Sequence, residues 1–329
     1  MEFSITTPNK MKSIPTLILL ILMCMEQVKT AEAGSSALTQ YTRSHEKNTL
    51  IQKLKTVYRL KPRLNDEGDL HAVYGIKGEM EISDAVWQAL VDTPSLRHVQ
   101  AVRLSMEDVS YIGEMNQLTY LNLSGGSLDF DAAMAHIGKL EHLEELNLHH
   151  SRNFSGEGCR HLPKLQNLRH LVFHNIRPFN AEGIIESVAQ LPNLRSLHLT
   201  ALIHLPMTSL EPLRGHPKLE SLIYPQQDEI PQFLDLLSSM PSINEVMILS
   251  KPGELQILNE DCINGLLKLD GLETIEMHNV TLSERDYEKL SEKFSDAQIE
   301  LWQRESYHAT KREVVPFDDE DLSDTQTGE

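Results

Sequence analysis

The feature that most constrains the fold is the spacing of leucines in LTYLNLSGGSL, residues 118–128. Leu118, Leu121, Leu123 and Leu128 stand at positions 1, 4, 6 and 11 of this segment. The spacing fits neither one face of a helix nor strict alternation along a strand. It predicts a short strand that buries one face, followed by a turn that buries a further apolar side chain. Such a unit cannot cover its own apolar face, so it requires neighbours of the same kind.

The chain contains these neighbours at a period near 25 residues. The apolar residues at position 4 follow one another at intervals of 22, 25, 25, 26, 25, 24, 29 and 24 residues, and they are Val99, Leu121, Leu146, Leu171, Leu197, Leu222, Val246, Ile275 and Ile299. Eight repeats are well formed, residues 299–301 make a shortened closing strand, and residues 70–75 make a degenerate opening one. The linking segments predict helices near residues 131–139, 181–191, 230–240 and 283–294. The seventh repeat is the least regular.

The segments PSLRHVQAVRL, NQLTYLNLSGGSL and PNLRSLHLTAL resemble the leucine-rich repeat family. The repeat length is similar to the ribonuclease-inhibitor-like and cysteine-containing subclasses, and the looser repeats are similar to secreted bacterial proteins of unknown role. The resemblance implies an α/β fold, a right-handed solenoid in which parallel strands line the concave side of an arc and helices cover the convex side. The sequence departs from the family at position 9, where a hydrogen-bonding Asn or Cys is usual; here that position holds Leu104, Gly126, Ser151, Ile176, Leu202 and Val280.

The first 33 residues have the pattern of an export signal. Lys10 and Lys12 precede an apolar run at residues 14–25, and Ala31 and Ala33 then fit a small-residue cleavage site. The run of 12 residues is shorter than the roughly 20 needed to span a bilayer. We therefore expect a secreted or extracytoplasmic protein, in the periplasm or at the cell surface, with no stable membrane span after cleavage. An uncleaved anchor is the alternative.

Four parts follow from these patterns. Residues 1–33 are the signal, 34–69 a polar lead-in with a capping helix, 70–302 the repeat domain, and 303–329 an acidic tail that we expect to be disordered. The basic amphipathic helix over residues 46–60 covers the first repeat in this interpretation, and lying on a membrane surface is its alternative role. The whole chain carries 48 acidic and 30 basic residues, a net charge of −18, so nucleic acid is not an expected partner.

Two cysteines remain after the signal, Cys159 and Cys262. In the repeat alignment they lie four repeats apart, which at about 4.8 Å per strand places them roughly 20 Å from each other. That distance is too large for a disulfide. We expect both to be small buried apolar side chains without a metal role.

Side chains at positions 3, 5 and 7 of each repeat point away from the core, on the concave side. In the first five repeats these positions are polar and rich in histidine, whereas repeats six and seven are apolar there. The candidate binding residues on this face are Tyr120, Asn122, Glu145, Asn147, His149, His170, His174, His198, Ile223 and Met247. The apolar patch around Ile223 and Met247 is either a partner-binding surface or is covered by the irregular segment 251–262.

The sequence contains no established catalytic motif, so it gives no positive reason to name a reaction. The leading hypothesis is an exported, non-catalytic scaffold without a cofactor that binds a protein or glycan through its concave face. A structural envelope or surface protein that self-associates is the second hypothesis. The third is a metal-dependent hydrolase at His149, His174 and His198, because His149 and His174 occupy position 7 of adjacent repeats with Cβ atoms about 5 Å apart.

Overall fold

We analysed a computed structural model of the chain, which divides into two compact units, residues 1–53 and 54–329. The structure describes residues 44–303 and 312–313, apart from 127, 152–153, 175–180, 201–204, 226–228, 251–252 and 254. The expected signal (1–33), most of the lead-in (34–43) and the end of the acidic tail (314–329) lie outside the described residues. Residues 44–53 are helical, and the helix continues to residue 56. Among the described helices, none has the length and apolarity needed to traverse a bilayer.

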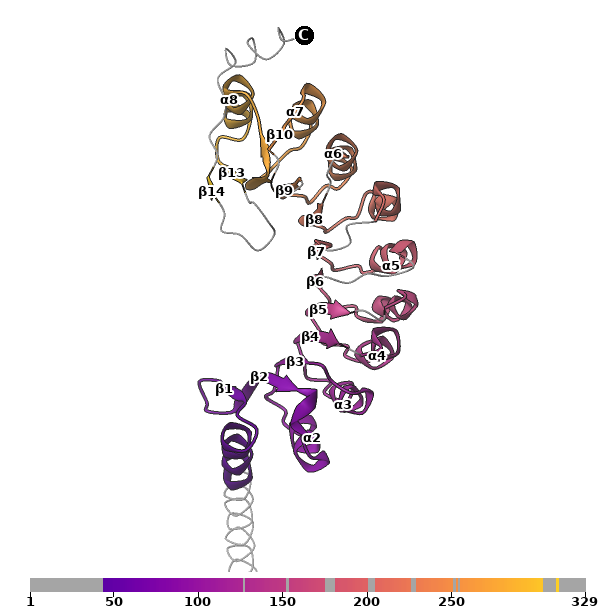
Figure 1. Cartoon of the computed structure of the whole chain (residues 1–329), viewed down its shortest axis with the longest axis vertical. Helices are drawn as coiled ribbons and strands as arrows, with labels where there is room; N and C mark the ends of the chain where they lie inside the picture. Colours follow the sequence, from indigo (N-terminus) through magenta and orange to yellow (C-terminus); the bar gives the residue numbers. More distant parts are fainter. Residues whose placement is uncertain are drawn as a thin grey trace, which may run out of the picture. The chain divides into compact units, whose positions relative to one another are not determined.

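The second compact unit is built on one sheet of 12 strands in which each strand pairs with the next (Figure 1). The strands of its parallel part are β2 (Leu70–Lys77), β3 (His98–Val102), β4 (Tyr120–Gly126), β5 (Glu145–Ser151), β6 (His170–His174), β7 (Ser196–His198), β8 (Ser221–Pro225), β9 (Glu245–Leu249), β11 (Thr274–His278) and β13 (Gln298–Gln303). The sheet ends on two antiparallel strands, β1 (Lys61–Leu64) and β14 (Arg312–Glu313).

The strand register agrees with the repeat alignment at every step. Val99 pairs with Leu121, Leu121 with Leu146, and the position-4 residues continue in pairs to Ile275 and Ile299. The opening strand is also in register, because Val73 pairs with Val99. The leucine spacing therefore predicted which residues of neighbouring strands face each other.

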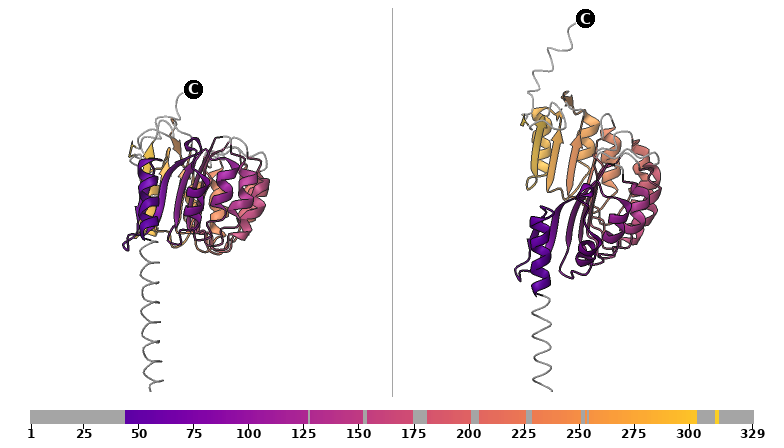
Figure 2. Two further views of the ribbon diagram at one scale, coloured as in Figure 1. Left: turned by 90° about the horizontal axis from the view of Figure 1, so that it is seen from below. Right: turned by 60° about the horizontal axis from the view of Figure 1, so that its bottom comes forward.

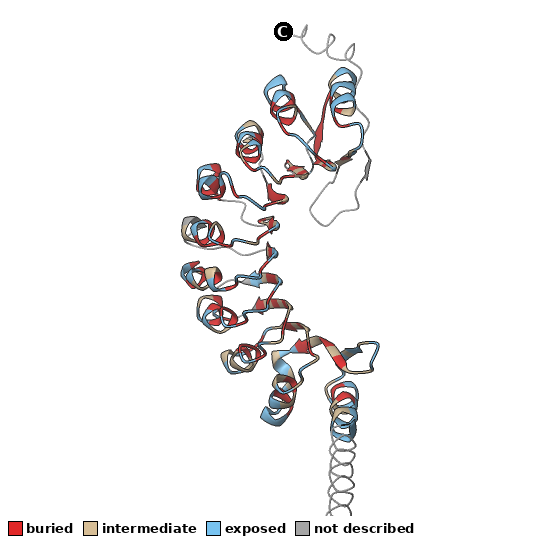
Figure 3. Cartoon of the chain, turned by 180° about the vertical axis from the view of Figure 1, so that it is seen from behind, coloured by how far each residue is buried: buried red, intermediate tan, exposed pale blue. Residues whose placement is uncertain are grey.

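Helical segments link the strands and cover one side of the sheet. They are α2 (Asp84–Val91), α3 (Met106–Ile112), α4 (Phe130–Ile137), α5 (Ala181–Val188), α6 (Ile230–Ser238), α7 (Glu260–Leu266) and α8 (Glu284–Lys293), with 3₁₀ segments η1 (Gly78–Met80), η2 (Glu157–Lys164) and η3 (Met207–Leu213). Within the second unit, the strands line the inner side of a curve and the helices its outer side, with buried residues between the two layers (Figures 2 and 3). This is the leucine-rich repeat solenoid that the sequence predicts.

Local sequence explains where several of these helices begin and why η2 and η3 are 3₁₀ segments instead of α-helices. The side chains of Ser105, Asp129 and Ser283 accept backbone N–H groups at the starts of α3, α4 and α8, as expected for N-caps. Pro163 and Pro212 lie inside η2 and η3. Proline has no N–H for an i−4 hydrogen bond, so neither segment forms a regular α-helix.

A row of polar side chains connects successive repeats at the position just before the first leucine, which we number 0. Each donates a hydrogen bond of 2.7–2.9 Å to a backbone carbonyl of the preceding repeat, and together they form a turn ladder: Ser95, Gln117, Asn167, Asn193 and Ser242. The sequence lacks the family's ladder residue at position 9. The turn ladder supplies inter-repeat hydrogen bonds on a different edge of the solenoid.

Three features of the fold differ from the sequence-based expectation. The sheet begins with β1, inside the segment that we expected to be lead-in and helix, because a turn at Asn65 and Gly68 folds β1 back onto β2. At the other end, β14 extends the sheet beyond residue 302. In the irregular seventh repeat, an extra strand β10 (Gln256–Ile257) pairs with β12 (Val280–Thr281) of the eighth repeat to form a separate two-stranded sheet. The two cysteines are free and buried, as expected.

Candidate binding site on the concave face

All ten candidate residues lie on strands β4 to β9, at positions that alternate with buried core residues. On β6 and β9, for example, the buried residues are Leu171, Phe173, Val246 and Ile248, and the residues between them are partly or fully exposed. The parallel register therefore brings side chains from six repeats to the inner side of the sheet. The sequence predicted this placement because position within the repeat fixes the face of the strand.

Four of the ten side chains form a hydrogen-bonded group, which we call the polar cluster: Tyr120, Asn122, Glu145 and Asn147. The Asn147 amide nitrogen donates to Glu145 Oε1 at 2.7 Å and to the Tyr120 hydroxyl at 3.4 Å. The Asn122 amide nitrogen also donates to that hydroxyl at 3.4 Å. Asn147 is only 7% exposed, and its Oδ1 atom is buried without a hydrogen-bond partner. The cluster therefore holds an unused acceptor beside a carboxylate.

A row of rings extends from the polar cluster towards the N-terminal end of the sheet. The His98 ring lies 5.3 Å from the Tyr120 ring and 4.9 Å from the His71 ring, measured between centroids. Burial lowers the pKa of His98, the neighbouring His71 lowers it further, and Glu145 opposes the shift. Repeat counting does not identify His71, because Ala72 holds position 3 of β2 and is the residue that pairs with His98.

Three imidazoles make a second group, the histidine cluster: His149, His150 and His174. The ring centroids lie 5.3 Å apart for His149 and His174, 6.3 Å for His149 and His150, and 5.7 Å for His150 and His174. Burial lowers the pKa of His149, and the two other imidazoles lower it further. The sequence predicted the pairing of His149 with His174, and the register places them opposite each other.

The described part of the chain has no metal site that would support the hypothesis of a metal-dependent hydrolase. No group of three or more His, Cys, Asp or Glu side chains there is arranged to hold a metal ion. His198, the third residue of that hypothesis, lies on β7 and pairs with Val172 of β6 instead of with a member of the histidine cluster. Burial lowers the pKa of His198, with opposing effects from Glu245 and Glu145.

The apolar patch, Ile223 and Met247, is less exposed to solvent than its repeat positions predict. Ile223 is only 5% exposed, whereas its neighbour Met247 on β9 is half-buried. Ile223 stands on β8 between His198 and Met247 on the adjacent strands, and its side chain belongs to the buried part of the protein. Ile223 is therefore largely covered rather than exposed, in line with the alternative of a covered patch, and its role as a binding residue stays a prediction. Asn147 is likewise almost fully buried, so it does not present a free side chain to solvent.

Buried polar contacts also occur at the C-terminal end of the concave face. His278 Nε2 lies 2.6 Å from Glu276 Oε1, and both side chains are largely buried. On the next strand the Trp302 indole N–H donates to Glu300 at 2.7 Å. These pairs satisfy their own polar groups, so they define the shape of this end of the face and offer few free hydrogen-bonding groups.

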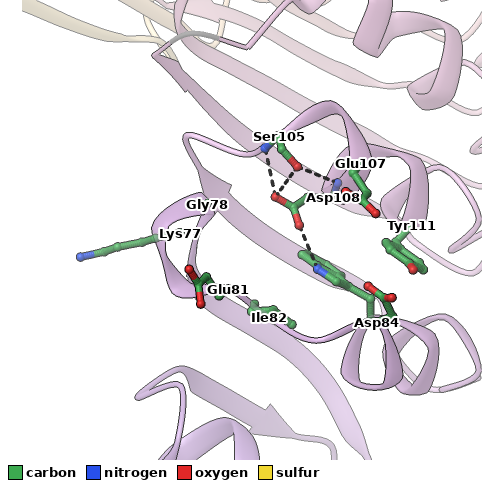
Figure 4. A pocket seen from close by; sticks show the side chains of 10 residues that line it. Lys77, Gly78, Glu81, Ile82, Asp84, Ser105, Glu107, Asp108 and Tyr111 are labelled. Carbon is green, nitrogen blue, oxygen red and sulfur yellow. Dashed lines mark hydrogen bonds between the residues drawn. The ribbon is translucent and has the colours of Figure 1, made fainter.

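A hollow on the other side of the sheet, between α2 and α3, was not predicted from the sequence (Figure 4). The rings of Trp87 and Tyr111 stack with centroids 6.0 Å apart, and the Trp87 indole donates to Asp108 at 3.0 Å. Partial burial raises the pKa of Tyr111, and the carboxylate of Asp84 raises it further. Asp108 also caps α3 through Ser105. The carboxylates here are thus used in local structure.

No family model matches the chain, and no curated protein sequence matches it. Several solved structures are similar. An internalin of Listeria monocytogenes is 18% identical, with a TM-score of 0.39, over 66% of this chain and 64% of the internalin. A Bacteroides fragilis protein is 16% identical, with a TM-score of 0.46, over 74% and 77% of the two chains. A leucine-rich repeat protein of Leptospira interrogans is 14% identical, with a TM-score of 0.27, over 70% and 88%. The chain thus spans less than two thirds of the internalin's length.

Proposed function

We propose that this chain is a non-catalytic scaffold that binds a protein partner through the concave face of the repeat solenoid. The observation that carries the proposal is the arrangement of polar side chains on β4 to β7. They come from four consecutive repeats, share one face, and are held in register by a parallel sheet. Such a surface is preorganised, so little conformational entropy is lost when a partner binds.

The side chains on this face favour recognition over catalysis. Nucleophilic catalysis by serine requires a base within hydrogen-bonding reach of the hydroxyl. In the described part of the face, the hydroxyls of Ser196 and Ser221 have no hydrogen bond to a histidine, and the Ser221 hydroxyl is buried and unpaired. The Thr200 hydroxyl contacts His174 Nδ1 at 3.4 Å, which is longer than the roughly 2.6–3.2 Å expected between a nucleophile and its base. The negative charge of the chain favours a partner with basic groups.

We propose further that the protein works outside the cytoplasm. The support is the pattern of residues 1–33, with two lysines, an apolar run and a small-residue site. An exported solenoid meets other secreted or surface proteins, or glycans. Glycan binding is the alternative, and a glycan array with the purified chain distinguishes it from protein binding.

Site-specific photo-crosslinking tests which face binds. A crosslinking amino acid replaces His170, which is exposed on the concave side, or Ala135, which is exposed on α4 on the helical side. We expect adducts with one partner protein from the position of His170 and few from that of Ala135. Equal labelling from both positions would contradict concave recognition. Adducts only between copies of this chain would instead favour the self-associating surface protein.

A further inference from the structure

One hydrogen-bond acceptor of the polar cluster, Asn147 Oδ1, lacks a donor, and the carboxylate of Glu145 beside it lacks a cation in the described part of the chain. Asn147 is more than nine-tenths buried, and its amide nitrogen is committed to Glu145 Oε1 at 2.7 Å. That short bond fixes the orientation of the amide, because the reverse orientation would place two oxygen acceptors against each other. The Oδ1 atom is left buried and unpaired. Buried polar atoms are rarely unpaired in folded proteins, so this exception calls for an explanation, and a donor supplied by a ligand is one.

The carboxylate of Glu145, next to this oxygen, lacks a positively charged partner in the described part of the chain. It is half-buried on β5, and in the described part of the chain no lysine or arginine lies within ion-pair distance. His98 does not supply the missing charge at neutral pH, because burial and His71 lower its pKa despite the opposing effect of Glu145. A partly desolvated carboxylate gains most from a cation that also donates hydrogen bonds.

The unpaired Asn147 oxygen and the Glu145 carboxylate together indicate which chemical group a ligand would place here. It must carry a positive charge and at least two N–H donors that reach adjacent acceptors. A guanidinium group has five N–H donors in a planar fork and stacks on aromatic rings, whereas an ammonium group is a compact, strongly hydrated charge. The Tyr120 ring belongs to the same cluster, since its hydroxyl lies 3.4 Å from the Asn147 amide. We propose that Glu145, Asn147 and Tyr120 bind the guanidinium group of an arginine side chain on the protein partner.

Access to the Asn147 oxygen requires side chains of the cluster to shift. Tyr120 is held to this cluster by two hydrogen bonds of 3.4 Å, which are long and therefore weak. Its half-buried side chain can move to admit a flat guanidinium group and then pack against it. The Glu145–Asn147 bond, at 2.7 Å, stays in place and keeps the two acceptors side by side.

This inference rests on the proposed function, so its test begins with peptides. Phage-displayed random peptides are selected on the purified full chain, and the affinities of the selected peptides are measured by fluorescence anisotropy. Each arginine of a selected peptide is then replaced by citrulline, which keeps the shape of the side chain but removes its charge, or by lysine. We expect arginine to be enriched, and one citrulline or lysine substitution to weaken binding about tenfold or more.

Variants of the chain give the matched comparison. Glu145→Gln and Asn147→Leu should each weaken the arginine peptide several-fold, with about a tenfold loss for Glu145→Gln. Glu245→Gln is the control, because Glu245 is a half-buried carboxylate at the same repeat position on β9. Its effect should stay below about twofold. Circular dichroism spectra that match the wild type show that the variants are folded.

The outcomes separate this inference from the proposed function. Peptides that bind the concave face without arginine, or equally well with lysine or citrulline, would overturn the guanidinium assignment and leave concave recognition intact. Equal effects of Glu145→Gln and Glu245→Gln would do the same. If no peptide is selected, or if no concave variant changes binding, both the inference and the proposed function fail.

Discussion

Replacement of Asp131 by alanine tests how the outer turns of successive repeats are held together. Oδ2 of Asp131 accepts the backbone N–H of Ser155 at 2.6 Å, and Oδ1 accepts those of Gly156 at 3.1 Å and Gly158 at 2.8 Å. Burial by itself would raise the pKa of Asp131, but these backbone donors, together with the Ser155 hydroxyl, outweigh burial and lower the pKa below its usual value. One carboxylate therefore secures the start of the following repeat.

The geometry gives the size of the expected effect. A hydrogen bond to a charged acceptor contributes about 1.5–3 kcal/mol in net. Three bonds to one half-buried carboxylate are not additive and are screened by solvent, so we expect Asp131→Ala to lower the free energy of unfolding by about 3 kcal/mol. Asp131→Asn keeps one acceptor oxygen but places an NH₂ group against a backbone donor, and should cost about 2 kcal/mol. The alanine variant should melt roughly 6–12 °C below the wild type.

Urea denaturation followed by far-UV circular dichroism, together with calorimetry, measures both variants at neutral pH. Asp129→Ala is the matched control, because Asp129 caps α4 through a single bond of 3.0 Å from the Ala132 N–H. Loss of one N-cap costs about 1 kcal/mol. If Asp131→Ala is no more destabilising than Asp129→Ala, then the three bonds to the next repeat do not carry the stability assigned to them.

The pH dependence of the same variant gives an independent check. The folded-state pKa of Asp131 is lowered, so its contribution is fully present above the unfolded-state pKa of about 3.9 and is lost as the pH falls through the folded-state value. The difference in stability between wild type and Asp131→Ala should stay constant from neutral pH to about pH 5. It should shrink below about pH 4. A difference that instead changes near neutral pH would point to another group.

Three further predictions concern other parts of the fold. A Cβ atom at Gly158 would lie 2.5 Å from the nearest backbone atom of α4, so Gly158→Ala should cost about 3 kcal/mol in urea denaturation, and a neutral result would contradict this close approach. Gln117→Ala should cost about 1 kcal/mol through its lost ladder bonds, whereas His142→Ala, at the same repeat position without such a bond, should cost less than about 0.5 kcal/mol, and equal losses would refute a role for the ladder. The pKa values of His149 and His198 are lowered, mainly by burial, so the unfolded chain binds protons first as the pH falls. Stability should therefore decrease below about pH 6.5, and the His149→Gln, His198→Gln double variant should lose less than the wild type; an unchanged pH profile would exclude both residues.

The repeat register was predictable from the sequence because it depends on one strong signal. Each position-4 residue, from Val99 to Ile275, is buried in the same layer, and a shift by one residue would expose the whole apolar set. Consecutive strands therefore align without any information from other proteins. The same argument placed His149 beside His174, since residues at equal positions in adjacent parallel strands are neighbours.

The turn ladder and the first strand were not predictable in the same way. The ladder residues at position 0 are Ser, Gln and Asn in turns, and polar residues in turns usually need no partner beyond water. Their hydrogen bonds to the preceding repeat depend on the path of the backbone, which the pattern does not specify. The strand β1 has the sequence KPRL, whose proline and charges are unusual within a sheet and suit only an edge.

The burial of Ile223 and Asn147 depends on the packing of neighbouring side chains, which periodicity cannot supply. Both occupy position 5, which the repeat assigns to the concave side, yet they are only 5% and 7% exposed. For Asn147 the cause is visible in its contacts with Glu145 and Tyr120. Position in a repeat predicts the face on which a side chain stands, but not how far its neighbours cover it.

Folding alone does not require the unpaired oxygen of Asn147. The leucines at the core positions of β5 satisfy the fold completely, and the concave positions of a strand with no role beyond stability could hold apolar or fully paired residues. Instead, among the residues that the structure describes, the carboxylate of Glu145 on β5 has no cation within ion-pair distance, and the adjacent Asn147 Oδ1 has no donor. An unmet polar group inside a regular repeat lowers the stability of the free protein and is relieved only when a donor arrives. This local conflict between sequence and fold therefore supports the arginine site that we propose on β5 over other positions of the concave face.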